Sequence, residues 1–368
     1  MSEAESLSVH QNDNELVELS HFHSVNILVG VVSSLFCIST LIVFFSRRNF
    51  FHHNKLLTLL GFADLCSSLG IVLLGMMRKA IYDRIMETSQ VPIETSWSCA
   101  IKPFVYLRLI GALIPPLVLT IVSIERFLAV YMPNFYRRRI SPYPNIAPMV
   151  VLLHCGISLF AAYSVAWYYR TKLVDFFCGR KRSFSPEYST YVFLTSIVGY
   201  AMAFLINVIT ACRLARLSFF YRQNSVNSET GKHIRRLHYL MAISLLAFLL
   251  VGVPDALFLS SPWLGPSGSA LSKALSEPSN WMIAARCSAN FFVYLLFREE
   301  FRVRVYEMLG CLSTDPSRER EYEVSALGGT NQNRIAIVGQ WNQQAKNSIS
   351  LLSEFAERQI RPTAESRK

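Results

Sequence analysis

Charged side chains inside otherwise apolar stretches are the residues of this sequence that could do chemistry. Glu125 and Arg126 are adjacent near the end of one such stretch, which also contains Arg108, and Asp64 and Arg286 lie within two others. A charge at the centre of a membrane helix costs about 2.5–3.5 kcal/mol on insertion scales, so such residues are usually kept for a purpose. Two opposite charges can pair, and a guanidinium group can bind a carboxylate through two hydrogen bonds.

The apolar stretches that hold these charges predict the fold class. Hydrophobic residues make up 52% of the 368 residues, and the mean hydropathy is +0.30. Crossing the roughly 30 Å core of a bilayer takes about 20 helical residues, and helices satisfy their own backbone there. The sequence therefore predicts an all-α membrane protein, folded as a seven-transmembrane helix bundle. The predicted spans are 25–45, 56–77, 101–131, 146–168, 189–215, 238–262 and 281–297.

The chain is expected to divide into four parts. Residues 1–24 are interpreted as an acidic extracellular tail and residues 25–297 as the bundle. Residues 298–312 place apolar side chains at helical spacing with arginines between them, which predicts an amphipathic helix on the inner membrane surface. Residues 313–368 are polar and predict a disordered cytoplasmic tail. Cys311 is a candidate for palmitoylation, with an unmodified thiol as the alternative.

The distribution of lysine and arginine predicts the orientation. These residues gather in the loops after the first, third and fifth spans, which puts the amino terminus outside and the carboxyl terminus inside. We therefore expect a multi-pass protein of the plasma membrane, and we attribute the net charge of +11 to topology rather than to nucleic-acid binding. Cys99 and Cys178 fall in the outer loops and are the candidate disulfide pair there. No histidine cluster, metal-ligand spacing or nucleophile motif occurs, so we expect neither enzyme activity nor a cofactor.

Four stretches resemble motifs of rhodopsin-like (class A) G-protein-coupled receptors, and they occur in the matching spans. In the second span, Leu-Leu-Gly-Phe-Ala-Asp-Leu at 59–65 resembles Leu-x-x-x-Ala-Asp-Leu. In the third, Glu-Arg-Phe at 125–127 resembles the Asp/Glu-Arg-Tyr triplet. Pro254 ends a stretch of the sixth that resembles Phe-x-x-Cys-Trp-x-Pro. In the seventh, Asn-Phe-Phe-Val-Tyr at 290–294 resembles Asn-Pro-x-x-Tyr.

The sequence also departs from the pattern of that family. Gly252 stands where the sixth span of the family has Trp, so the usual rotamer switch is missing. Phe291 stands where the seventh span usually has Pro. The chain therefore looks like a divergent branch, similar to invertebrate neuropeptide receptors and nematode-type chemosensory receptors.

The resemblance implies the partners of the chain and its switch. The ligand would be extracellular, either a peptide or a small acidic molecule, and the inner partner would be a heterotrimeric G protein. Arrestin and a kinase could act on the serines of the tail. The residues implied for activation and coupling are Glu125, Arg126, Pro254, Asn290 and Tyr294. In the inactive state Glu125 would pair with Arg126 and hold it inward, whereas a static salt bridge at a helix end is the alternative.

A buried polar core is also implied by the resemblance. Arg286 lies four residues before Asn290, which by the resemblance places it near Asp64. An ion pair between Asp64 and Arg286 could then replace the sodium ion that the family often binds. The alternative is that Arg286 faces another helix or water.

Arg108 is the candidate for ligand binding, together with Asp255. Arg108 precedes Arg126 by eighteen residues, which is five helical turns, so both face the same core. Where amine receptors carry Asp this chain has Arg108, which argues for an anionic ligand. The alternative is that Arg108 and Asp255 pair with each other and contact no ligand.

Two other functions fit parts of the pattern. A chemosensory receptor for environmental small molecules is one alternative. A transporter or channel lined by Asp64, Arg108, Asp255 and Arg286 is another, but the sequence has no inverted repeat.

Overall fold

A computed structural model describes most of the chain. The described residues are 13–88, 92–140, 142–174, 176–222, 239–261, 263, 265, 270–271, 274–275 and 278–310. Cys311 and the tail 313–368 lie outside the described residues, so the palmitoylation and the tail remain predictions.

Helices dominate the described part, which confirms the predicted all-α class. The long helices are α1 (Asp13–Phe45), α3 (Lys55–Thr88), α5 (Pro103–Tyr131), α7 (Ile146–Tyr168), α9 (Pro186–Arg222) and α13 (Pro278–Phe297). The sixth span, Tyr239–Ser260, contains the π-helix η2 (Phe248–Gly252) and α11 (Val253–Ser260). Shorter helices are α2 (Arg48–His53), α4 (Ser96–Ala100), α6 (Pro133–Phe135), η1 (Tyr136–Ile140), α8 (Arg180–Ser183) and α14 (Glu299–Met308).

Six helices of the described part are long and apolar enough to cross a membrane. They coincide with the first six predicted spans. The seventh, α13, has the 20 residues that a span requires, but Asn280, Arg286 and Asn290 lower its mean hydropathy. Polar residues within a membrane helix are retained mainly where they face the protein interior, and all three of these side chains are buried.

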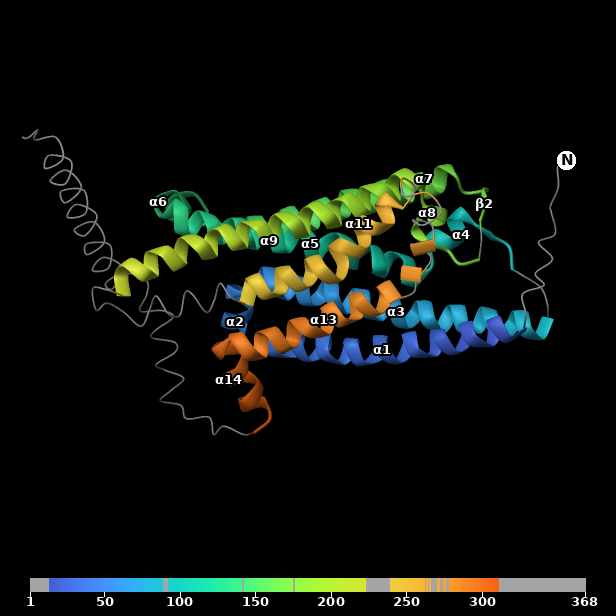
Figure 1. Ribbon diagram of the computed structural model, residues 1–368, viewed down its shortest axis with the longest axis horizontal. Coiled ribbons are helices and arrows are strands. Elements are labelled where there is room, and N and C mark those ends of the chain that lie inside the picture. Colours follow the sequence, from blue (N-terminus) through green and yellow to red (C-terminus); the bar gives the residue numbers. More distant parts are fainter. Residues whose placement is uncertain are drawn as a thin grey trace, which may run out of the picture. The chain divides into compact units, whose positions relative to one another are not determined.

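The long helices run alongside one another (Figure 1), and glycines let two pairs of them approach closely. Helix α3 packs between α1 and α5, and α5 packs on α9. A Cβ at Gly70 would lie 2.7 Å from Cγ of Arg108, and one at Gly199 would lie 2.6 Å from Cβ of Pro116. Small residues are the usual means by which membrane helices pack closely. These contacts fix α5, which carries Arg108, between α3 and α9.

Helix α1 begins earlier than the first predicted span. It starts at Asp13, so residues 13–24, which the sequence analysis assigned to a tail, are helical. The apolar side chain of Leu19 packs against Tyr82 and Ile85 at the far end of α3. Contacts of this kind extend both helices beyond the lengths predicted from hydropathy alone.

A small sheet, which was not predicted, joins two outer segments. Strand β1 (Glu94–Thr95) pairs antiparallel with β2 (Leu173–Val174), with Glu94 opposite Val174. Helix α4 follows β1 directly, and the Thr95 side chain caps it by accepting a hydrogen bond of 3.1 Å from the backbone N–H of Ser98. Strands of two residues leave no alternating pattern that a sequence could show.

The sixth span changes its helical geometry just before Pro254. The backbone N–H of Val253 donates to the carbonyl of Phe248, five residues back, which defines the π-helix η2. Pro254 has no N–H and cannot continue the α-helical ladder, so a local irregularity next to it has a direct cause. Single π turns of this kind occur frequently at functional sites.

Candidate functional site

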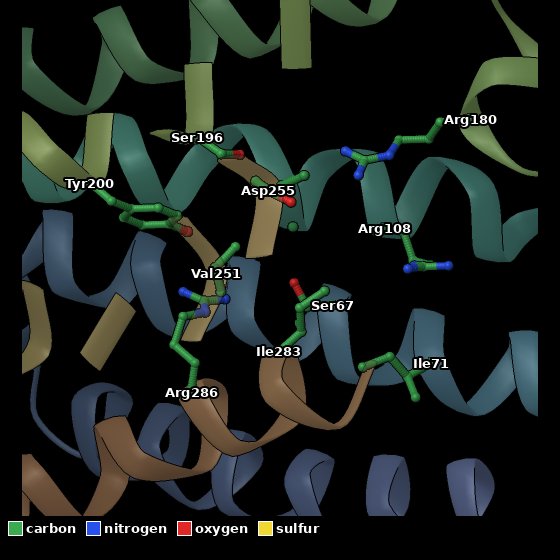
Figure 2. A pocket seen from close by; sticks show the side chains of 12 residues that line it. Ser67, Ile71, Arg108, Arg180, Ser196, Tyr200, Val251, Asp255, Ile283 and Arg286 are labelled. Carbon is green, nitrogen blue, oxygen red and sulfur yellow. The ribbon is translucent and has the colours of Figure 1, made fainter. Parts of the chain in front are cut away.

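A cavity that is partly open to solvent lies among the helices. Residues from α3, α5, α8, α9, η2, α11 and α13 line it (Figure 2). The polar residues of its lining are Ser67, Arg108, Arg180, Ser196, Tyr200, Asp255 and Arg286. Segments distant in sequence therefore bring charged groups to one cavity.

The charges of the described lining residues are unequal, with three guanidinium groups and one carboxylate. Asp255 is buried at the start of α11. Its strongest attractive partner is Arg180, it accepts a hydrogen bond from Ser196, and Arg108 attracts it more weakly. The alternative that Arg108 and Asp255 pair mainly with each other is therefore not favoured, because the carboxylate of Asp255 is attracted more strongly by Arg180 than by Arg108.

Arg108 lines the cavity, as its helical spacing predicts. Its Nη2 donates to Oδ1 of Asn280 over 2.9 Å, which connects α5 with α13. Both Arg108 and Asn280 are polar groups inside a bundle, and a hydrogen bond of this kind reduces the free energy of burying them.

Arg180 is a lining residue that the sequence analysis did not propose as part of the site. Its guanidinium carbon lies 4.6 Å from the centroid of the Phe193 ring, a cation–π contact. Burial lowers the pKa of Arg180, and the charge of Asp255 acts in the opposite direction. Because the ordinary pKa of arginine is about 12.5 or higher, the side chain stays cationic near neutral pH. The available signal was its place two residues after Cys178.

The outer segment that carries Arg180 is fixed by covalent and hydrogen bonds. Cys99 and Cys178 form a disulfide, as predicted, with a Cα–Cα distance of 5.1 Å. Ser96 Oγ donates to the carbonyl of Ser183 at the end of α8 over 2.8 Å, and the Ser96 N–H donates to the carbonyl of Lys172 over 2.9 Å. Helix α8 is thus tied to α4 from both sides.

Asp64 and Arg286 form the buried ion pair that the sequence analysis proposed. Arg286 Nη2 lies 2.8 Å from Asp64 Oδ1, and both side chains are 2% exposed. Asn290 Nδ2 donates to Asp64 Oδ2 over 2.6 Å. Arg286 Nη2 also lies 3.3 Å from the sulfur of Cys287. A carboxylate buried this deeply needs such partners, because an unpaired charge in a low-dielectric interior is strongly unfavourable.

Arg286 belongs to this pair and to the lining of the cavity at once. Its Nε and Nη1 have no hydrogen-bond partner among the described residues. Figure 2 shows its guanidinium directed toward the cavity from α13. Buried donors are nearly always satisfied, so the N–H groups of these two nitrogens are available to a bound molecule.

Tyr294 lies one helical turn from Asn290 on the same face of α13. It is fully buried, and its ring lies 5.6 Å from that of Phe44, 5.6 Å from that of Phe301 and 6.3 Å from that of Tyr239, between centroids. Its hydroxyl has no hydrogen-bond partner among the described residues. It is thus held by ring packing.

The predicted inward-facing pair of Glu125 and Arg126 is absent from the described part of this structure. Arg126 is exposed while Glu125 is half-buried. Neighbouring residues of an α-helix point about 100° apart, so one of them faces outward when the other faces the bundle. Burial raises the pKa of Tyr136 in η1, the Glu125 carboxylate raises it further, and Arg126 opposes this, so Tyr136 lies close to both.

Gly252, two residues before Pro254, stands in the sixth span where the resemblance would place a tryptophan. A Cβ at Gly252 would lie 3.1 Å from Cδ2 of Phe248 and 3.7 Å from Cβ of Tyr200. These two aromatic residues therefore occupy the space around Gly252. Tyr200 also lines the cavity, a role that the sequence analysis missed because α9 showed no motif.

The helical membrane fold and the charged internal cavity define a multi-pass membrane protein with an internal polar site. Residues 27–309 match the family described as "Serpentine type 7TM GPCR chemoreceptor Srsx", and the chain belongs to this family. The match covers the seven predicted spans except residues 25 and 26, and it supports the chemosensory branch named among the resemblances. It also favours a receptor over a transporter. No curated protein matched the chain.

Proposed function

We propose that the protein is a chemosensory receptor of the plasma membrane that detects a small organic anion and activates a heterotrimeric G protein. The observation that carries this proposal is the convergence of Arg108, Arg180 and Arg286 on one partly open cavity. The amino terminus would lie outside and the carboxyl terminus inside.

The charge of the cavity supports an anionic ligand. Among the described residues, the lining has three guanidinium groups and Asp255 as its one carboxylate. An ammonium group in this space would be repelled, whereas a carboxylate could receive charge-assisted hydrogen bonds. The family membership supports an environmental chemical as the source of the ligand.

The position of the cavity supports a small molecule rather than a long peptide. Its lining comes from α3, α5, α8, α9, η2, α11 and α13, so it lies between the helices of the bundle, where small-molecule sites are common. Arg180 reaches it from α8, an outer segment held by the Cys99–Cys178 disulfide. We therefore place the outer half of the bundle on the ligand side.

Coupling to the G protein is assigned to the opposite end of α5. Arg126 is exposed there and close to Tyr136, so it is accessible to a partner without rearrangement of its own side chain. Ligand binding would shift the bundle between two states that differ in the access this end offers.

The test is G-protein activation in transfected cells exposed to organic acids, to their uncharged amides and to a peptide library. We expect acids, and not the matching amides, to activate the wild type. Arg126→Ala should abolish the response, and Arg108→Gln should raise the half-maximal acid concentration about tenfold or more. Arg170→Gln, in an exposed outer position, is the matched control and should respond as the wild type does.

Two results would contradict the proposal at equal surface expression. Activation by peptides but not by acids would reject the ligand class. An acid response that persists in Arg126→Ala would reject the assigned coupling end.

A further inference from the structure

We propose that His23 is part of a contact between α1 and α13 that acid breaks, because the contact forms only while the imidazole ring is neutral. It lies where α1 packs against both α3 and α13. The contact needs no bound ligand, so this inference is independent of the function proposed for the cavity.

The contact is a chain of two hydrogen bonds through the amide of Asn26. Trp281 Nε1 donates to Asn26 Oδ1 over 2.6 Å, which joins α13 to α1. Asn26 Nδ2 lies 3.2 Å from Nδ1 of His23 on the preceding turn of α1. Both His23 and Asn26 are fully buried, so bulk water does not compete for these bonds.

The donors and acceptors of this chain fix the protonation state of His23. An indole nitrogen can only donate, so the Asn26 atom that faces Trp281 must be the amide oxygen. The amide nitrogen then faces His23 and can only donate, so Nδ1 of His23 must accept. The single proton of the neutral ring is therefore on Nε2, which is buried without a hydrogen-bond partner among the described residues.

A second proton on the ring would break the chain. It would bind Nδ1 and make it a donor that faces the donating amide nitrogen of Asn26. Turning the amide over would give His23 an acceptor again, but it would present the nitrogen to the N–H of Trp281. One of the two hydrogen bonds is lost in either case, so acid weakens the connection between α1 and α13.

The surroundings of the ring also disfavour a positive charge on it. The charge of Arg78, in α3, acts on His23 and repels a second cation there. The ring of Tyr82, also in α3, stacks on that of His23 with 5.4 Å between centroids. A cation–π attraction from Tyr82 favours a charged ring, but burial of an unpaired charge outweighs it. From α13 the junction receives Trp281, which carries no charge.

Two further charged groups of α3 bond to α1 beside this chain. Ser20 Oγ donates to Oδ1 of Asp83 over 3.1 Å, and Nζ of Lys79 donates to Ser24 Oγ over 3.1 Å. Each is directed to a serine rather than to the imidazole ring. These bonds between α1 and α3 do not depend on the ring, so the effect of acid should be concentrated at α13.

Release of Trp281 also affects a residue that contacts the cavity lining. Trp281 directly follows Asn280, whose Oδ1 accepts a hydrogen bond of 2.9 Å from Arg108. Consecutive helical residues point about 100° apart, so this turn of α13 is held by α1 on one side and by α5 on another. Loss of the α1 contact therefore leaves Asn280 less constrained.

Acid should lower the stability of the folded protein. A histidine in an unfolded chain takes up a proton as the pH falls through about 6.5. The folded network has no acceptor for that proton. The unfolded chain then binds more protons than the folded one, so stability decreases as the pH falls below about 6.5.

The experiment uses the full-length protein in lipid nanodiscs without ligand, at about pH 7.5 and about pH 5.0 and at constant ionic strength. It measures the melting temperature and the amide hydrogen exchange of residues 278–285, corrected for the intrinsic effect of pH on exchange. His23→Asn keeps an oxygen near the position of Nδ1 and does not titrate in this range. Acid should lower the melting temperature of the wild type by about 2 °C or more beyond any change in His23→Asn, and only the wild type should exchange faster at 278–285.

Two more variants separate the hydrogen-bond chain from burial of the ring. His23→Phe keeps a ring on Tyr82 and should match His23→Asn in its small response to acid, and it replaces that variant in the comparison if His23→Asn does not fold. Trp281→Phe frees the amide of Asn26 to turn its oxygen toward a protonated ring, so its loss of stability in acid should be smaller than that of the wild type. His21→Gln, at an exposed position two residues away, is the matched control and should behave as the wild type does.

The proposal is overturned if the wild type and the non-titrating variants lose the same stability between the two pH values. A loss without faster exchange at 278–285 would show that the proton acts away from α13. A loss in Trp281→Phe as large as in the wild type would reject the hydrogen-bond chain. The assay contains neither organic acid nor G protein, so its failure and the failure of the proposed function are separate results.

Discussion

The guanidinium carbon of Arg298 lies 5.4 Å from the centroid of the Tyr239 ring. It also lies 5.7 Å from the ring centroid of Phe50, and Arg298 Nη2 donates to Oδ1 of Asn54 over 2.9 Å. This side chain, just beyond the end of α13, therefore contacts the sixth span and the junction of α2 and α3. Any outward movement of the sixth span at this end must break its contact with Arg298.

Removing the ring of Tyr239 should raise the basal activity of the receptor. A cation–π contact contributes about 1 kcal/mol, so its loss in Tyr239→Ala should shift a two-state equilibrium by roughly fivefold toward the active form. The measurement is G-protein activation without ligand, at matched surface expression. Tyr239→Phe keeps a ring above Arg298 and should show a much smaller change. Equal basal activity in wild type and Tyr239→Ala would show that this contact does not restrain activation.

Breaking the Asp64–Arg286 pair from one side should destabilise the fold severely. Arg286→Ala leaves a buried carboxylate without its cation, which typically costs about 3–5 kcal/mol. In Asp64→Asn/Arg286→Ala the charge is removed from both partners, and most of the stability should return. The unfolding temperature of the purified receptor reports both effects. A double variant as unstable as Arg286→Ala would mean that Arg286 stabilises the bundle by packing rather than by charge.

Removing the disulfide should impair ligand response through Arg180. Loss of a native disulfide typically costs about 2–5 kcal/mol, and here it also releases α8 from α4. We expect Cys99→Ser/Cys178→Ser to respond to acids at concentrations at least tenfold higher. Cys212→Ser, which changes an exposed free thiol, is the matched control. An unchanged acid response in the double variant would show that α8 is positioned by its hydrogen bonds alone.

The outer ion pair of Glu94 and Lys102 should make stability depend on pH in the acidic range. Burial raises the pKa of Glu94, but hydrogen bonds from Lys102, at 2.8 Å, and from Ser98 outweigh this, so the pKa lies below its ordinary value of 4.5. A lowered pKa in the folded state stabilises above pH 4.5, and this contribution is lost as the pH falls through the lowered value. Because both side chains are partly exposed, we expect less than about 1 kcal/mol.

The check compares the unfolding temperatures of wild type and Glu94→Gln across pH. The variant should be slightly less stable near pH 7, and the difference should shrink as the pH falls below about 4. A difference that stays constant over this range would mean that the effect does not come from the Glu94 charge.

Residues on regular helices could be predicted from the sequence, because helical spacing fixes their relative positions. Arg108 was expected to face the core, and it lines the cavity. Arg286, four residues before Asn290, was expected near Asp64, and the two form an ion pair. In both cases the helical repeat, counted from a residue of a recognised motif, was sufficient to predict which way the side chain faces.

Positions set by tertiary contacts could not be predicted in this way. Arg180 reaches the cavity because a disulfide and hydrogen bonds fix α8, and no periodicity encodes that. The exposure of Arg126 depends on how α5 is rotated in the bundle. The early start of α1 depends on the contact of Leu19 with α3.

The π-helix η2 divides the sixth span into two segments of different phase. A π turn holds one residue more than an α turn, so it offsets the preceding residues by about 100° around the axis. Without that offset, Asp255 and Tyr239 could not both keep their present surroundings, since rotating one into place would turn the other away. The extra residue in η2 therefore lets a single helix present a cavity-lining face at one end and an Arg298-contacting face at the other.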